Sequence, residues 1–107
     1  MDDKELLELA AKAVDIRLEW DGNPKEWQPI YYEGKTYHYW NPLTDDGDAL
    51  RLAVKLQIIV GKYDEYANAG GISNDVDIVI WNHEENDPYA ATRRAIVRAA
   101  AALGESV

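Results

Sequence analysis

The carboxylate-rich run around Gly47 is the stretch of this sequence whose residue types could do chemistry. It lies in WNPLTDDGDALRLAVKL, residues 40–56, and holds Asp45, Asp46 and Asp48. A phosphate-binding loop needs several glycines and usually a lysine, whereas three carboxylates would repel phosphate. A calcium loop of the EF-hand type needs acidic residues at alternate positions and a glutamate at the twelfth. The spacing here fits neither site, and we predict that the run binds no metal.

The same residues fit a junction between a strand and a helix. The Asn-Pro pair at 41–42 would end the strand, and Thr44 or Asp45 would cap the helix that follows. Acidic side chains in the first turn are favoured by the positive end of the helix dipole. Asp48 can pair with Arg51 three residues later. We therefore interpret the run as structural.

A second polar cluster, NHEENDP at residues 82–88, could ligate a metal or supply an acid and a base. Its candidate side chains are His83, Glu84, Glu85 and Asp87. Zinc needs three or four close ligands, and the sequence does not show whether His38 lies near the others. We interpret the cluster as a solvated turn before a helix, and it stays open whether it binds anything.

Nucleophilic catalysis has little support. The sequence contains no cysteine, and neither Ser73 nor Ser106 lies in a G-x-S-x-G elbow. Two histidines leave little room for acid–base designs. We therefore predict that the protein is not an enzyme, with no catalytic residues and no cofactor.

Apolar periodicity and turn residues predict the elements that position these side chains. Helices are expected over residues 3–14, 48–56 and 88–103, with Asp87 as the cap of the last helix and Gly104 at its end. Strands are expected over 57–63 and 76–81 and as a hairpin over 29–40, and loops over 15–29 and 68–75. The predicted fold class is α+β, in the order α-β-β-α-β-β-α, with a mostly antiparallel four-stranded sheet packed with helices. The strand order stays open.

Alternation and helical spacing also predict which side chains share a face. The hairpin is expected to turn at Glu33-Gly34, with Tyr37 and Tyr39 on one face of its second strand. The helix over 48–56 is almost entirely apolar and is expected to be the central, buried one. Its expected core residues are Leu50, Ala53 and Val54, with Arg51 and Lys55 exposed. The expected buried stripe of the last helix is Tyr89, Ile96, Val97, Ala100 and Leu103.

The charge balance is strongly acidic. With 11 basic and 20 acidic residues, the formal net charge is −9. Such a field would repel duplex DNA, so no direct DNA binding is expected. No apolar run approaches the ~20 residues of a membrane span, and the acidic, amphipathic N-terminus does not resemble a signal peptide. We predict a cytoplasmic protein with no membrane association.

Two blocks of the sequence, WNPLTDDGDALRLAVKL and ATRRAIVRAAAALG, resemble the signature blocks of the phage ABA sandwich domain family, and DKELLELAAKA matches its usual opening. The resemblance implies a single domain over residues 1–107, an α/β sandwich and a phage or prophage origin, and it supplies no catalytic residues. The sequence departs from the family at Gln57, where a glycine is expected to end the second helix.

Two hypotheses for function stay open. In the first, the protein is an acidic, phage-encoded inhibitor of a bacterial defence system, similar to an anti-CRISPR protein, that occupies a basic, nucleic-acid-binding surface of a host protein. Its candidate contacts are Asp21, Glu26, Glu33, Asp64, Glu65, Asp75 and Asp77. In the second, it binds a small ligand such as a nucleotide signal through Arg93, Arg94 and Arg98 or through the Gly70-Gly71 loop. A purely structural accessory role and a dimeric state also stay open.

Overall fold

The fold is described from a computed structural model. It describes residues 2–22, 27–62, 66–73, 76–83 and 87–105, with the side chains of 61–83 left out. Along the chain the elements are α1 (Asp3–Ala13), β1 (Glu19–Asp21), β2 (Gln28–Glu33), β3 (Thr36–Tyr39), α2 (Asp46–Leu56), β4 (Ile59–Lys62), β5 (Tyr66–Ser73), β6 (Val76–His83) and α3 (Pro88–Glu105).

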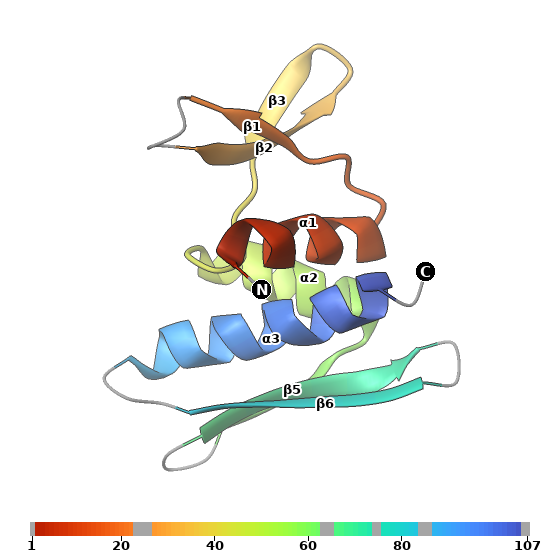
Figure 1. Cartoon of the computed structure of the whole chain (residues 1–107), viewed down its shortest axis with the longest axis vertical. Coiled ribbons are helices and arrows are strands. Elements are labelled where there is room, and N and C mark those ends of the chain that lie inside the picture. Colours follow the sequence, from red (N-terminus) through yellow and green to blue (C-terminus); the bar gives the residue numbers. More distant parts are fainter. Residues whose placement is uncertain (1, 23–26, 63–65, 74–75, 84–86, 106–107) are drawn as a thin grey trace.

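The α+β class is confirmed, but the single four-stranded sheet is wrong. The described strands form two three-stranded antiparallel sheets, each in sequential order, β1-β2-β3 and β4-β5-β6. Figure 1 shows the layers in order: the first sheet, then α1 and α2, then α3, then the second sheet. The helices therefore separate the two sheets.

Two strands lie where loops were predicted. β5 covers most of residues 68–75 despite Gly70 and Gly71, because both of its edges are hydrogen-bonded, one to β4 and the other to β6. Glycine weakens a strand but does not prevent such pairing. β1 has three residues and exists through its pairing with β2, in which Glu19 lies opposite Ile30. Neither strand has an alternating pattern of its own that would predict it.

The hairpin between β2 and β3 turns one residue later than predicted. Glu33 pairs with Thr36, so the two-residue loop is Gly34-Lys35. Gly34 has a φ of 61°, a left-handed conformation that glycine adopts without strain.

Aspartates begin all three helices. The Asp2 carboxylate accepts a hydrogen bond from the Glu5 amide at 2.8 Å, and Asp45 accepts one from the Asp48 amide at 2.8 Å. Asp87 accepts from the amides of Tyr89 and Ala90 at 3.0 Å. These caps confirm the predicted helix starts and choose Asp45 rather than Thr44 for α2.

α1 and α2 end in the same way. Asp15 and Gln57 follow them with φ angles of 58° and 56°, and the next amide in each case bonds five residues back, Ile16 to Ala11 at 2.9 Å and Ile58 to Ala53 at 2.8 Å. This is the Schellman arrangement, whose left-handed position usually holds glycine. The glycine expected at position 57 would therefore suit the left-handed backbone found there. Gln57 adopts the same conformation under strain, because it has a β-carbon.

The central helix is α3, not α2. α3 contacts α1, α2 and all three strands of the second sheet, and its buried residues extend from Ala91 to Gly104. α2 buries only Ala49, Leu52 and Ala53, while Leu50 and Val54 are 65% and 69% exposed. The prediction that Leu50 and Val54 lie in the core is wrong because α2 packs on α3 along one narrow stripe.

The ends of α3 also differ from the prediction. Tyr89 in its first turn is exposed rather than buried, whereas Ile96, Val97, Ala100 and Leu103 are buried as predicted. Gly104 lies inside the helix and faces α1. A methyl group built on Gly104 would overlap the backbone carbonyl of Leu9. Gly104 therefore permits close approach of the two helices rather than marking a helix end.

Tryptophans attach the first sheet to the helices. Trp40 is buried in the main core cluster, and Trp20 packs against its edge. The Trp20 indole donates a hydrogen bond to the Glu8 carboxylate of α1 at 3.1 Å, and the Lys4 ammonium lies 5.2 Å from the centre of the Trp20 ring. The sheet therefore has an inner face toward the helices and an outer face toward solvent.

Replacing Gly104 should test the α1–α3 contact. Gly104→Ala is expected to lower the free energy of unfolding by about 2–3 kcal/mol, because the added methyl group forces two backbones apart. The control is Gly47→Ala, the same change within α2, where the nearest atoms belong to the flexible Arg51 side chain at 3.1 Å. Urea denaturation measures both, and equal effects of the two changes would contradict the close contact.

Replacing Gln57 should relieve strain at the end of α2. Gln57→Gly is expected to raise the free energy of unfolding by about 0.5–1 kcal/mol, because glycine adopts the left-handed conformation without a clashing β-carbon. Gln57→Ala keeps the β-carbon and should give no such gain. If alanine stabilised the protein as much as glycine in denaturant titrations, backbone strain would not be the cause.

Candidate functional site

The outer face of the first sheet is rich in tyrosine. Directly opposed residues of antiparallel strands share a face, and the register pairs Tyr32 with Tyr37 and Ile30 with Tyr39. Tyr32, Tyr37 and Tyr39, together called the tyrosine face, are 53%, 50% and 60% exposed. The Tyr37 ring meets the Tyr32 and Tyr39 rings edge to face, with centroids 6.2 and 5.8 Å apart. The predicted common face of Tyr37 and Tyr39 is therefore confirmed.

Ile30 lies on the same face as these tyrosines. It is buried, yet it does not belong to the main core cluster between the helices. Alternation places it on the same side of β2 as Tyr32. The outer face therefore combines a buried apolar residue with three exposed tyrosines.

Acidic side chains border the tyrosine face at β1. Glu19 lies opposite Ile30 and Asp21 opposite Gln28, which places both carboxylates on the outer side. The pKa of the Tyr39 hydroxyl is raised above its ordinary value, chiefly by charge repulsion from Tyr37 and a hydrogen bond with it, and to a smaller extent by Asp21. The Tyr39 hydroxyl therefore keeps its proton near neutral pH and lies near the Asp21 carboxylate.

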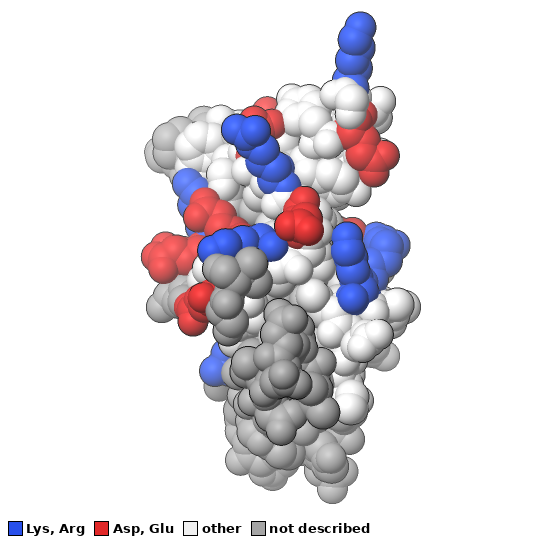
Figure 2. Space-filling model, turned by 90° about the vertical axis from the view of Figure 1, so that its right-hand side faces the viewer, with Lys and Arg blue, Asp and Glu red and all other residues white. Residues whose placement is uncertain are grey.

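The predicted acidic contacts are not all brought together. Asp21 lies beside the tyrosine face, but Glu33 lies on the opposite side of β2, with its carboxylate 4.0 Å from the His38 imidazole. Glu26, Asp64, Glu65 and Asp75 lie outside the described residues. Asp77 is in β6, opposite Ile72, and its side chain is not described. On the face shown in Figure 2, acidic and basic side chains are interspersed over the described part of the surface.

The three arginines of α3 do not converge on a pocket. Arg93 donates to the Leu43 carbonyl at 2.9 Å and forms an ion pair with Asp46 at 2.6 Å. Arg94 forms an ion pair with Asp3 of α1 at 2.9 Å, and Arg98 lies on an exposed position of the helix. Arg93 and Arg94 therefore connect α3 to two different elements.

The aspartates of the opening run likewise have structural partners. Besides its cap on α2, Asp45 lies 3.8 Å from Arg51, and Asp46 pairs with Arg93. Asp48 accepts from the Asn41 amide at 3.0 Å and from Arg51 at 2.7 Å, as the predicted Asp48–Arg51 pair requires. Within the described residues no three histidine or acidic side chains are grouped so as to hold a metal ion. Glu84 and Glu85 of the second polar cluster lie outside that part of the chain.

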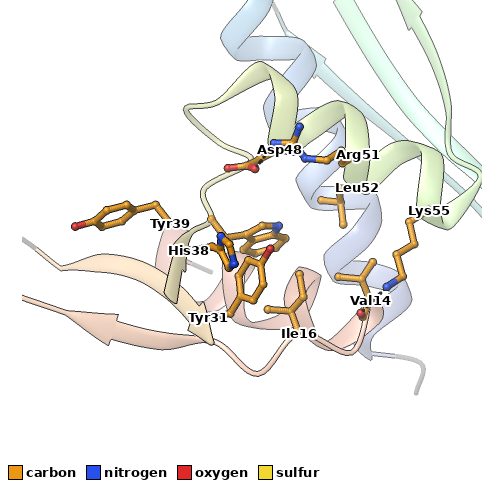
Figure 3. Close-up of a pocket in the computed structure, with 10 residues that line it drawn as sticks. Val14, Ile16, Tyr31, His38, Tyr39, Asp48, Arg51, Leu52 and Lys55 are labelled. Atoms are coloured by element: carbon orange, nitrogen blue, oxygen red, sulfur yellow. Dashed lines mark hydrogen bonds and ion pairs between the residues drawn. The ribbon is translucent and has the colours of Figure 1, made fainter. Parts of the chain in front are cut away.

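A cleft of about 480 Å³ lies between the inner face of the first sheet and α2. Figure 3 shows Tyr31 and His38 on the sheet side, Arg51, Leu52 and Lys55 on the α2 side, and Val14 and Ile16 at one end, whereas Tyr39 points away. We call this space the interlayer cleft. This cleft could not be predicted from the sequence. Aromatic residues gather over 27–40, but Lys25 and Lys35 are the only cations near them along the chain. The sequence shows that Arg51 and Lys55 are four residues apart on one helix. It does not show that this part of the helix faces the first sheet.

Comparisons of the chain with protein-family models, with curated proteins and with solved structures found no match. The resemblance to the phage family therefore stays a prediction. None of the helices that the structure describes is long and apolar enough to cross a bilayer.

Replacing the arginines of α3 should separate structural from binding roles. Arg93→Met is expected to lower the free energy of unfolding by about 1.5–2 kcal/mol, because Arg93 is only 17% exposed and bonds both a carbonyl and a carboxylate. Arg94→Met should cost less than about 1 kcal/mol, since its ion pair with Asp3 is more exposed. Thermal and urea denaturation measure both, and equal costs would contradict a structural role particular to Arg93.

Proposed function

We propose that the protein is a small, non-enzymatic binding protein whose tyrosine face, bordered by Asp21, docks on a basic surface of a host protein. The observation that carries this proposal is the cluster of three exposed tyrosines on the outer sheet face, in which Tyr37 contacts both Tyr32 and Tyr39. Tyrosine is enriched at the centres of protein interfaces, because its ring buries a large apolar area and its hydroxyl still forms hydrogen bonds.

The charge of this region favours a protein partner over nucleic acid. Platforms that stack bases usually lie in a positively charged groove. Here Glu19 and Asp21 border the tyrosines, and the whole chain carries a net charge of −9. A basic protein surface complements both features. Long-range attraction would speed its association with the protein and would weaken with added salt.

Basic surfaces of this kind are common on proteins that bind nucleic acid. Together with the resemblance to a phage family, this supports a host defence complex as the partner, such as a CRISPR surveillance complex. The protein would act there by competing with target DNA. The ligand-binding alternative through Arg93, Arg94 and Arg98 gains no support, since Arg93 and Arg94 are each paired with an acid of the protein itself.

The test is displacement of labelled target DNA from a purified surveillance complex of the host. The double variant Tyr37→Ala/Tyr39→Ala is expected to weaken competition by about tenfold or more, as loss of interface tyrosines commonly does. Asp21→Lys should weaken it too, and more so at low salt. Because these residues are exposed, the melting temperature should change little.

Two exposed residues elsewhere provide matched controls. Tyr89→Ala removes a tyrosine that is 69% exposed on α3, and Glu5→Lys reverses an exposed acid on α1. Both should compete as the unchanged protein does. Full competition by the double tyrosine variant would exclude the tyrosine face as the contact surface. Failure of the unchanged protein to displace DNA would exclude this partner class.

A further inference from the structure

The interlayer cleft has one aromatic wall. Tyr31 and His38 lie opposite each other in the register of β2 and β3. Their ring centres are 5.2 Å apart and their planes are inclined by 30°, so the two rings are in contact. Val14, Ile16 and Leu52 add apolar lining, and buried Trp40 lies at the base. A flat aromatic molecule could pack against these side chains, with the Tyr31 hydroxyl and the His38 ring nitrogens as hydrogen-bonding groups at their edges.

The facing wall, on α2, carries Arg51, which is paired with Asp48 and Asp45, and the second cation Lys55. Arg51 and Lys55 are four residues apart on α2, so their side chains leave the helix on the same side. The Lys55 ammonium donates one of its three N–H bonds to the carbonyl oxygen of Val14 at 3.2 Å. This carbonyl is neutral, so the contact does not offset the charge of Lys55. The hydrogen bond to Asp48 raises the pKa of Arg51 further above its ordinary value, and so Arg51 keeps its charge.

Among the described residues that line the cleft, the acidic one is Asp48, and it is already engaged. One carboxylate oxygen of Asp48 accepts from the Asn41 amide at 3.0 Å, and the other accepts from Arg51 at 2.7 Å. Asp48 is therefore poorly placed to attract a cationic ligand. The Lys55 ammonium has three N–H donors, one of which bonds the Val14 carbonyl, and Arg51 has five N–H groups in total. The chemistry of this space combines an aromatic surface with hydrogen-bond donors for an anion.

We propose that the interlayer cleft binds a small planar aromatic molecule that carries one anionic group, with its ring on Tyr31 and His38 and its carboxylate or phosphate toward Lys55 and Arg51. The volume of about 480 Å³ lies within the range of roughly 300–1,000 Å³ that is usual for small-molecule sites. This site lies on the inner side of the first sheet, while the tyrosine face lies on the outer side. The two proposals are therefore independent and can fail separately.

The test uses two anionic probes, adenosine 5′-monophosphate and 2-naphthoate, with adenosine and 2-naphthol as their neutral counterparts. Each is titrated into the ¹⁵N-labelled protein, and amide shifts are followed. At least one anionic probe should shift the amides of Tyr31, His38 and Lys55 saturably. Its neutral counterpart should bind about tenfold more weakly, the loss expected for a charge-assisted hydrogen bond. Absence of saturable shifts at these residues with both anionic probes would overturn the proposal.

Matched variants locate the site. Lys55→Gln should weaken the anionic probe about tenfold, whereas Lys35→Gln, at the exposed hairpin loop, should not. Tyr31→Leu should weaken binding of both the anionic probe and its neutral counterpart. Tyr32→Leu changes the next residue, which lies on the outer face, and should leave the affinity for both unchanged. Lys55 is exposed, so its variant remains informative even if Tyr31→Leu reduces folding. Unchanged affinity in Lys55→Gln, or equal losses in the two tyrosine variants, would overturn the proposed site.

Discussion

Parallel packing of α1 against α3 through small side chains is the contact on which the rest of the fold depends. Ala10 and Ala100 are fully buried, and Gly104 receives the Leu9 carbonyl where a side chain would not fit. Such close approach of two helices maximises dispersion contacts between their backbones. The opposite side of α3 packs against the second sheet, and α2 contacts α3 beside α1. Both the tyrosine face and the interlayer cleft belong to the first sheet, which the α1–α2 layer supports.

Helix starts could be predicted because the signal is local. Asp2, Asp45 and Asp87 each accept an amide hydrogen within three residues, so a short pattern contains the whole interaction. The buried side of α2 could not be predicted, because periodicity shows which residues share a face but not which neighbour covers it. Leu50 and Val54 are apolar and exposed for that reason. β5 was missed because its hydrogen bonds come from β4 and β6, while its own glycines argue against a strand.

The candidate sites likewise include one part that the sequence could predict and other parts that it could not. Alternation within β3 was enough to place Tyr37 and Tyr39 together, since the period of a strand is fixed. No spacing rule could bring Lys55 to Val14, which lies 41 residues earlier. Arg93 and Arg94 look like a cluster in the sequence. Successive helix positions, however, differ by about 100°, and the two guanidinium groups reach opposite neighbours, α2 and α1.

The α1–α3 contact also has a kinetic consequence. Arg94 and its partner Asp3 are 91 residues apart, and the two sheets and α2 all lie between them. Each sheet is a meander of neighbouring strands and can pair within its own short segment. The helical layer, in contrast, requires closure of a loop that contains almost the whole chain, and such closure slows folding. Local hairpins can therefore form before the core does, and the unpaired alanine surface of α1 stays exposed to other chains until α3 arrives.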